Sequence, residues 1–318
     1  MSKVISSHLT PPSRPALVLG GGGAYGVVQA AYIHAALEAG FRPSLVVGTS
    51  VGSLNGAWVA RRPDDKEELL RIWMGLDRLR ILHFNPIRVV HKIARGPRGL
   101  CQNTIVPRLI KEHVEPLRFE DLGLPLAVVA TNLSRSRKHV FRSGDLGQAI
   151  LASTAIPGIY DPIEIDGEFY ADGGLSASVD LVTALEMGAT EILAIDLTPT
   201  PPTFRSRTVV GVLRHSLGIL SRSTTDAMEA AVGRQMPVSV IRPDLSEHSP
   251  WRLDDSAATI AKNLEMARAT MRDVLDRDGH VQPFAPPALT DPSARQGARD
   301  PSPVDFRRFV PQRSEQAG

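Results

Sequence analysis

A short apolar run followed by a glycine-rich turn and an apolar helix occurs twice in the first 60 residues, and this repeat constrains the fold most. Residues 15–19 (PALVL) lead through Gly20–Gly23 into the helical pattern VVQAAYIHAALE. Residues 44–47 (SLVV) lead through Gly48–Gly52 into a second helical pattern. Fully apolar strands that alternate with helices are typical of parallel sheets buried on both faces. The sequence therefore predicts a three-layer α/β fold, with a central, mostly parallel sheet and helices on both faces.

The rest of the chain continues this alternation of strands and helices. Further strands are expected at 125–130, 138–141, 191–197 and 238–241, with a hairpin over 163–170 whose turn is Asp166-Gly167. Helices are expected over much of 64–118 and at 145–153, 208–235 and 256–275. The helix over 208–235 is expected to be an ordinary core helix rather than a lipid-facing lid, with these apolar positions: Val209, Val212, Leu213, Leu217 and Leu220.

We expect one folded domain with loose ends. Residues 1–14 are polar and contain proline, which predicts a flexible leader, and residues 15–277 form the domain. Residues 278–318 are rich in Pro, Ser, Gln and Arg, which is typical of a disordered tail.

Composition narrows the classes of partner and compartment. The formal net charge is +2, from 36 basic and 34 acidic residues, which does not favour nucleic acid as a partner. Cys101 is the single cysteine and excludes an intramolecular disulfide. Neither a signal-peptide pattern nor a run of about 20 apolar residues is present. We expect a cytoplasmic protein whose contact with lipid, if any, is peripheral at a membrane surface.

The second glycine-rich turn has the pattern of a nucleophile elbow. Gly48-Thr49-Ser50-Val51-Gly52 is G-x-S-x-G between an apolar strand and a helix, the context in which this motif exposes a reactive serine. The helix that follows directs its N–H groups and positive dipole end toward that serine. A helix N-cap is the simpler role for an isolated serine. The motif in this setting predicts that Ser50 is a nucleophile, flanked by Gly48 and Gly52.

The first glycine-rich turn admits two functions. Gly21, Gly23 and Gly26 match G-x-G-x-x-G, the dinucleotide-binding pattern, but the second strand ends in Ser50 without the carboxylate that would hold a ribose. Alternatively, N–H groups of Gly21, Gly22 and Gly23 form an oxyanion hole for acyl transfer. Adjacent parallel strands would place this turn beside Ser50. A nucleotide-binding protein remains an alternative at this point.

Asp172 is the candidate base for Ser50. It lies in Tyr170-Ala171-Asp172-Gly173-Gly174, where two glycines follow the aspartate in a tight turn after the hairpin. An ordinary turn aspartate is the simpler alternative. The histidines after Ser50 have no comparable setting. The spacing typical of metal ligands is also absent from His34, His83, His91, His113 and His139. No metal is expected, because a serine–aspartate pair needs none.

Together these motifs resemble the patatin-like phospholipases over residues 15–200. The matching segments are Gly20–Gly26, Gly48–Gly52, Asp172–Gly174 and the small-residue segment 152–158. The resemblance implies a lipid acyl hydrolase of the phospholipase A or lysophospholipase type, without a cofactor. It implies that Ser50 is the nucleophile and Asp172 its base, with Gly21–Gly23 as the oxyanion hole and Gly173 and Gly174 in the aspartate loop.

The chain departs from the family pattern at two places. Tyr25 stands where many members carry Lys or Arg, which bears on the preference for anionic headgroups, and residues 175–180 (LSASVD) lack the family's Asn and Pro. An acyl acceptor other than water would make the same site a transferase. A catalytically silent lipid-binding module is a third alternative, which would bind acyl chains and leave esters intact.

Overall fold

The computed structural model describes residues 13–76, 103–114, 117–199, 209–253 and 255–282. In this part of the chain, eight strands form one mixed sheet with the order β5-β6-β3-β2-β1-β7-β8, and β4 pairs with β3 in addition. The strands are β1 (Pro15–Leu19), β2 (Leu45–Thr49), β3 (Leu126–Asn132), β4 (Arg137–Phe141), β5 (Ile163–Ile165), β6 (Glu168–Asp172), β7 (Glu191–Ile195) and β8 (Val238–Ile241).

The middle of the sheet is parallel and its other part is antiparallel. β3, β2, β1, β7 and β8 run parallel to one another, whereas β4, β5 and β6 pair antiparallel. Each parallel pair is separated along the chain by at least one helix, as parallel crossovers require. The expected central, mostly parallel sheet is confirmed.

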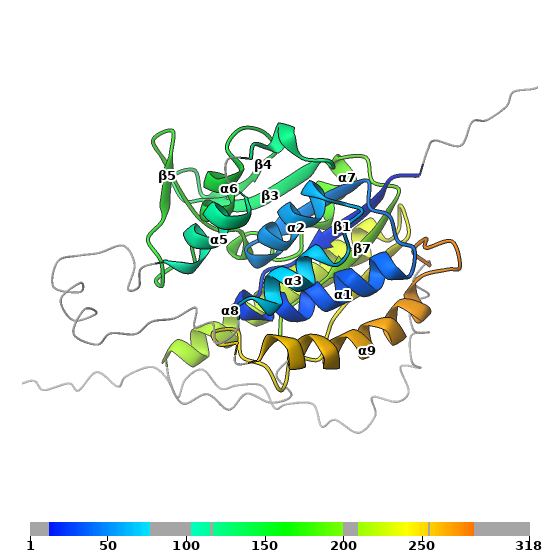
Figure 1. Cartoon of the computed structure of the whole chain (residues 1–318). Helices are drawn as coiled ribbons and strands as arrows, with labels where there is room; N and C mark the ends of the chain where they lie inside the picture. Colours follow the sequence, from blue (N-terminus) through cyan, green and yellow to red (C-terminus); the bar gives the residue numbers. More distant parts are fainter. Residues whose placement is uncertain (1–12, 77–102, 115–116, 200–208, 254, 283–318) are drawn as a thin grey trace, which may run out of the picture. The chain divides into compact units, whose positions relative to one another are not determined.

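Helices cover both faces of the sheet (Figure 1). Side chains alternate along β1: Leu17 and Leu19 join one hydrophobic cluster, and Ala16 and Val18 join the other. The first cluster includes residues of α1 (Gly26–Glu38), α2 (Val51–Arg61), α3 (Glu68–Met74), α5 (Ile105–His113) and α6 (Leu146–Ser153). The second cluster includes residues of α7 (Leu181–Glu186) and α8 (Val209–Val232). The predicted three-layer arrangement is therefore present.

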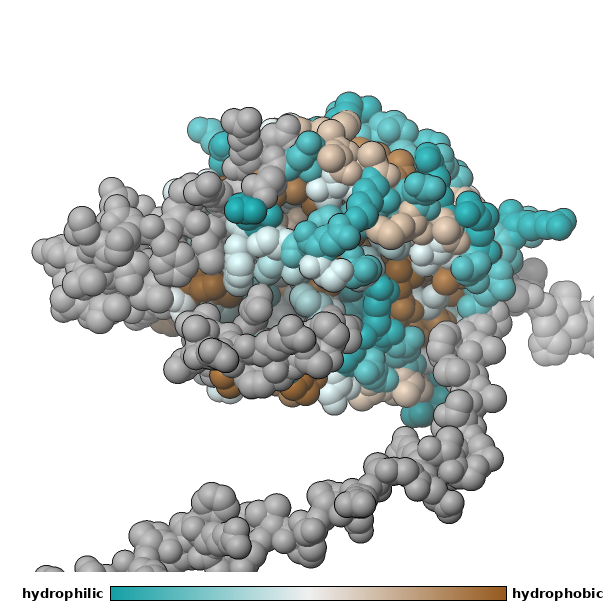
Figure 2. Space-filling view, turned by 90° about the horizontal axis from the view of Figure 1, so that it is seen from below, coloured by the Kyte–Doolittle hydropathy of each residue, from teal (hydrophilic) through white to brown (hydrophobic). Residues whose placement is uncertain are grey.

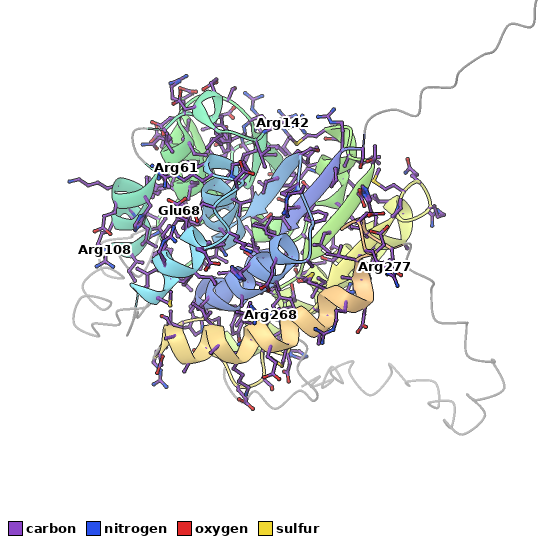
Figure 3. All side chains as sticks on the ribbon, turned by 45° about the vertical axis from the view of Figure 1, so that its right-hand side comes forward. Arg61, Glu68, Arg108, Arg142, Arg268 and Arg277 are labelled. Carbon is purple, nitrogen blue, oxygen red and sulfur yellow. The ribbon has the colours of Figure 1, made fainter. Side chains whose placement is uncertain are left out.

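One further helix, α9 (Ser256–Val274), lies outside α1 (Figure 1). α1 is mostly apolar and is buried on all sides from Gly26 to Leu37, so it needs cover on every side. α9, on which Figure 3 labels Arg268, supplies this cover. Arg268 forms a bidentate pair with Glu38 at the end of α1, with N–O distances of 2.6 and 2.9 Å.

Residues just outside the expected domain bounds, 15 and 277, also form hydrogen bonds with the domain. At the N-terminal end, Arg14 N donates to Thr190 Oγ1 at 2.8 Å. At the C-terminal end, Val281 is buried and its N–H donates to a Glu191 carboxylate oxygen at 2.6 Å. The packed chain therefore reaches residue 282, because buried Glu191 on β7 provides an acceptor for the turn after α9. Residues 1–12, 283–318 and Cys101 lie outside the described residues.

The expectation for 208–235 is wrong in one respect. The segment is helical, as α8, but Val212, Leu217 and Leu220 are exposed rather than packed in the core. Among the α8 side chains that the structure describes, Thr225 and Val232 are buried. The side chains of Val209 and Leu213 lie outside the described part. For 64–118, the structure describes α3 and α5, and residues 77–102 lie outside it. No helix of the described residues is long and apolar enough to cross a membrane.

Candidate active site

Ser50 lies in a strained backbone turn between β2 and α2. Its φ and ψ angles are 54° and −125°, a backbone conformation that residues other than glycine rarely adopt. Strained backbone of this kind is concentrated at functional sites. The two flanking glycines permit the turn, since a Cβ on Gly52 would lie well under 3.0 Å from Leu19 O and a Cβ on Gly48 equally close to Gly52 O. The G-x-S-x-G pattern therefore has the elbow geometry that the sequence predicts.

The sheet register brings Asp172 to Ser50. Thr49 at the end of β2 pairs with Val129 on β3, and Asp172 at the end of β6 pairs with the next residue, Ala130. β4 occupies the opposite edge of β3 at both positions, so β2 and β6 share one edge. β2 runs parallel to β3, and β6 runs antiparallel to it. The carboxyl ends of β2 and β6 therefore meet beside Val129 and Ala130 of β3. Ser50 Oγ donates a hydrogen bond to Asp172 Oδ2 at 2.6 Å.

The Asp172 carboxylate is buried with few partners. Its other oxygen accepts from Gly174 N at 2.7 Å. Burial raises the pKa of Asp172 from 3.8 to about 6, although the hydrogen bonds from Ser50 and Gly174 act in the opposite direction. Gly173 lets this loop pass β3 closely, since a Cβ there would collide with Val129 O. A carboxylate with a pKa near neutrality is suited to accept and return a proton.

The first glycine turn lies against Ser50. β1 and β2 are adjacent and parallel, and a Cβ on Gly21 would be 3.1 Å from Ser50 Cβ. Gly21 N is directed at Ser178 O at 3.4 Å, whereas the N–H groups of Gly22 and Gly23 donate to no acceptor in the described part of the chain. Gly23 has a φ of 59°, which favours glycine. Gly22 and Gly23 therefore offer the freer pair of donors for an oxyanion.

Ser153 is a site residue that the motifs do not single out. Its hydroxyl accepts a hydrogen bond from Ser50 N at 2.8 Å and donates to Val129 O at 2.6 Å. It thereby fixes the strained serine to the central strand β3. Ser153 lies in the small-residue segment 152–158, and this composition is the only sequence signal for it.

A buried polar relay supports the glycine turn from behind. Trp73 Nε1 donates to Asn55 Oδ1, and Asn55 Nδ2 donates to Gln29 Oε1, both at 2.9 Å. Gln29 Nε2 then donates to Gly20 O at 3.1 Å. Gln29 and Asn55 are fully buried, and buried amides of this kind fix the backbone that they contact. In the sequence, Gln29 and Asn55 are polar residues within otherwise apolar helical patterns, and this is the only feature by which they could have been identified.

Gly26, the last glycine of the dinucleotide pattern, has a packing role. A Cβ at this position would lie 2.5 Å from Trp73 Cζ2 and against Val51. Tyr25 beside it is buried in the core. The spacing G-x-G-x-x-G is thus accounted for by close contact between the start of α1 and its neighbours.

An apolar cavity opens beside Ser50. Its space, including the part open to solvent, is about 530 Å³. The wall is formed by Gly23, Ser50, Val51, Leu54, Trp58, Trp73, Asn103, Ile105, Val106, Leu109, Thr154, Ile156 and Tyr160. No histidine of the described residues lines it. A cavity of this size and lining suits an apolar chain attached to a group held at the serine.

Comparison with known proteins places the chain in a family. The model of the patatin-like phospholipase family matches residues 17–185, which contain Ser50, Asp172 and both glycine turns. The chain belongs to the patatin-like phospholipase family. The matched residues contain the elbow, the aspartate loop and strands β2 to β6.

Curated relatives match part of this chain. Patatin-like phospholipase domain-containing protein 7 of Mus musculus is 28% identical over 57% of this chain and 13% of its own length. An uncharacterized NTE family protein of Mycobacterium tuberculosis is 29% identical over 70% of this chain and 60% of its own. Lysophospholipase NTE1 of Mycosarcoma maydis is 30% identical over 57% of this chain and 9% of its own. The chain thus spans less than two thirds of each of these relatives.

A solved structure is also similar. VipD from Legionella pneumophila has a TM-score of 0.40 and 14% identity, covering 80% of this chain and 67% of that chain.

Among the described residues, no group of three or more His, Cys, Asp or Glu side chains is arranged to hold a metal ion.

Proposed function

We propose that this patatin-like chain is a lipid acyl hydrolase in which Ser50 is the nucleophile and Asp172 the general base. The observation that carries the proposal is the 2.6 Å hydrogen bond from Ser50 Oγ to Asp172 Oδ2 at a strained elbow. A serine hydroxyl becomes nucleophilic when an adjacent base takes its proton. The raised pKa of Asp172, about 6, matches the task of a base near neutral pH.

The first half of the reaction acylates the serine. Ser50 Oγ attacks the ester carbonyl carbon while its proton moves to Asp172 Oδ2. The carbonyl oxygen becomes an oxyanion, and the N–H groups of the Gly21–Gly23 turn, chiefly those of Gly22 and Gly23, stabilise it. When the tetrahedral intermediate collapses, the C–O bond to the alcohol breaks, and the proton on Asp172 passes to the departing oxygen.

The second half regenerates the enzyme. Asp172 takes a proton from a water molecule, whose oxygen attacks the acyl-enzyme carbonyl. Collapse of the second intermediate breaks the bond to Ser50 Oγ, which recovers its proton, and the fatty acid leaves. No metal or organic cofactor takes part in these steps. An alcohol in place of water would yield a transferred acyl group.

The proposed substrate is an acyl ester of a lipid, cleaved in the manner of a phospholipase A or lysophospholipase. The apolar side chains of the 530 Å³ cavity adjoin Ser50 and would hold the acyl chain. One relative is named a lysophospholipase, which is consistent with a single acyl chain in such a cavity. The proposal also places the protein in the cytoplasm with peripheral contact to membranes.

Labelling with a fluorophosphonate probe tests this proposal directly. Wild type is expected to form a covalent adduct, since the activated serine attacks phosphorus as it attacks a carbonyl. Ser50→Ala is expected to lose labelling entirely, and Asp172→Asn to slow it by about 10³-fold or more, because the base is gone. The measurement is the rate of adduct formation on folded protein, followed by in-gel fluorescence and intact mass.

Asp166→Asn is the matched control for the aspartate. Asp166 is exposed in the turn of the same hairpin, with a φ of 50° that asparagine also accepts. This variant should label at the wild-type rate. If folded wild type does not label, the hydrolase proposal fails, and binding of NAD(P) or of acyl chains without cleavage would then be measured.

The pH dependence of hydrolysis should report the buried carboxyl. Asp172 acts as a base only when ionised, and its pKa is raised to about 6. The kcat/KM for a soluble p-nitrophenyl ester is therefore expected to rise about tenfold per pH unit up to about pH 6 and to level off above it. A profile already flat from pH 5 to 8, on protein shown to be folded by circular dichroism, would contradict this role.

A further inference from the structure

Four apolar side chains in the first turns of α8 are exposed to solvent. Val212, Leu217, Ile219 and Leu220 have exposed fractions between 42% and 59%. The half-buried positions of the same turns are small or polar: His215, Gly218, Ser221 and Arg222. An ordinary surface helix buries its apolar side chains and exposes its polar ones. Figure 1 shows the start of α8, in yellow-green, extending from the lower left of the molecule.

The exposed apolar residues form one stripe. At 100° per residue, Ile219, Val212, Leu220 and Leu217 follow one another around less than half of the helix. Farther along α8 the exposed positions change to Ser223, Asp226, Ala227 and Ala230. The stripe is thus confined to the first three turns, and the later turns expose polar or small side chains.

Leu175 extends the stripe toward the proposed catalytic residues. It is 38% exposed and directly follows Asp172-Gly173-Gly174. Residues 174–178 and α8 line a shared shallow cleft that includes Leu175, Leu217 and Leu220. The segment 174–178 touches the catalytic groups at both ends, through Gly174 N on Asp172 and Ser178 O on Gly21 N. We call Leu175, Val212, Leu217, Ile219 and Leu220 the α8 surface.

The formal charges in the first part of α8 are all positive. Residues 209–225 contain Arg214 and Arg222 and no Asp or Glu. The next carboxylates, Asp226 and Glu229, are paired with Arg242 at 2.6 and 2.8 Å. An apolar stripe on a helical segment that contains basic residues and no acidic residue is typical of helices that lie in the interface of anionic membranes.

We propose that the α8 surface docks the protein onto an anionic lipid bilayer and so brings the Ser50 and Asp172 site to the membrane surface. This inference rests on the proposed function, because a lipid hydrolase must meet a substrate that resides in an aggregate. Apolar side chains of α8 and Leu175 insert at the headgroup boundary, and the net positive charge of this segment of α8 favours anionic headgroups. Where the face seen in Figure 2 is not covered by grey atoms, hydrophilic residues in teal and hydrophobic residues in brown are interspersed.

Vesicle flotation of the full chain tests the proposal. The probes are vesicles of phosphatidylcholine alone and of phosphatidylcholine with 30% phosphatidylglycerol. Wild type is expected to float with the anionic vesicles at 0.1 M NaCl and to bind them at least tenfold less at 0.5 M NaCl. Ile219→Ser/Leu220→Ser should lower the partition coefficient at least tenfold. Ala227→Ser/Ala230→Ser, on the exposed side of the same helix, should bind as wild type does.

Hydrolysis provides a second readout that separates docking from chemistry. Ile219→Ser/Leu220→Ser should retain the wild-type rate on a soluble p-nitrophenyl ester and lose at least tenfold on vesicle lipid. Wild type that floats but cleaves neither substrate would overturn the proposed function and leave docking intact. Wild type that does not float overturns docking. If light scattering then shows a dimer that Ile219→Ser/Leu220→Ser dissociates, the α8 surface binds a second copy instead.

Discussion

Asp172→Asn is expected to abolish hydrolysis and at the same time to stabilise the folded protein. The amide can keep both hydrogen bonds of the carboxylate, accepting from Gly174 N and donating to Ser50 Oγ, but it cannot take the serine proton. Ester hydrolysis should fall by about 10⁴-fold, as expected when the base of a serine nucleophile is neutralised. The gain in stability arises because a buried, ionised carboxylate is removed.

The gain in folding stability of Asp172→Asn should be larger at high pH than at low pH. The pKa of Asp172 is about 6 in the folded state against 3.8 as its ordinary value, so the folded state holds the proton more tightly. The resulting cost is absent below about pH 4, grows between pH 4 and 6, and is complete above, where it is about 3 kcal/mol. Urea unfolding at pH 4 and pH 8 should show a gain at pH 8 alone.

Two outcomes would contradict the account of Asp172. An equal gain at both pH values would mean that the charge is not its cause, and a loss of stability at pH 8 would mean that the carboxylate is favourably held. Asp166→Asn, exposed in the same hairpin, should change neither hydrolysis nor the free energy of unfolding.

Gly52→Ala is expected to prevent folding. The added Cβ would lie well under 3.0 Å from Leu19 O and within 2.8 Å of Gly20 O, both backbone atoms of the central strand and the turn that follows it. Backbone of a central strand cannot yield as a flexible side chain can, so α2 would have to separate from β1. We expect a loss of more than about 4 kcal/mol, which exceeds most single substitutions. Soluble yield and circular dichroism would measure it.

Gly218→Ala is the control for that substitution. A Cβ at Gly218 meets no atom within 4 Å, and the residue lies in the middle of α8. Alanine there should be neutral or should stabilise the helix by up to about 1 kcal/mol. A folded Gly52→Ala with wild-type stability would contradict the close approach of α2 to β1.

The site was predictable where its geometry is local. Gly48–Gly52 sets the elbow, and Gly173 and Gly174 set the aspartate loop, because each requires glycine within a few residues of its functional side chain. The adjacency of the Gly21 turn and Ser50 followed from two consecutive parallel strands. Asp172 was identified as a candidate from its turn and from the family resemblance, not from any local signal that it contacts Ser50.

Other features could not be predicted from local pattern. Gln29, Asn55 and Trp73 interact across three different elements, and Ser153 joins the elbow to β3 from 103 residues away. The helical period of α8 predicts an apolar stripe and does not say which way that stripe faces.

The sequence alone determined the alternation of strands and helices, the two glycine turns and the elbow at Ser50, because these depend on apolar periodicity and on backbone angles that few residues adopt. Only the tertiary structure decided that β6 meets β2 along one edge of β3, which brings Asp172 to Ser50. It also decided that the apolar stripe of α8 faces outward. Both depend on pairing between segments far apart in the chain, and such pairing is selected by the packing of the whole sheet rather than by any one segment.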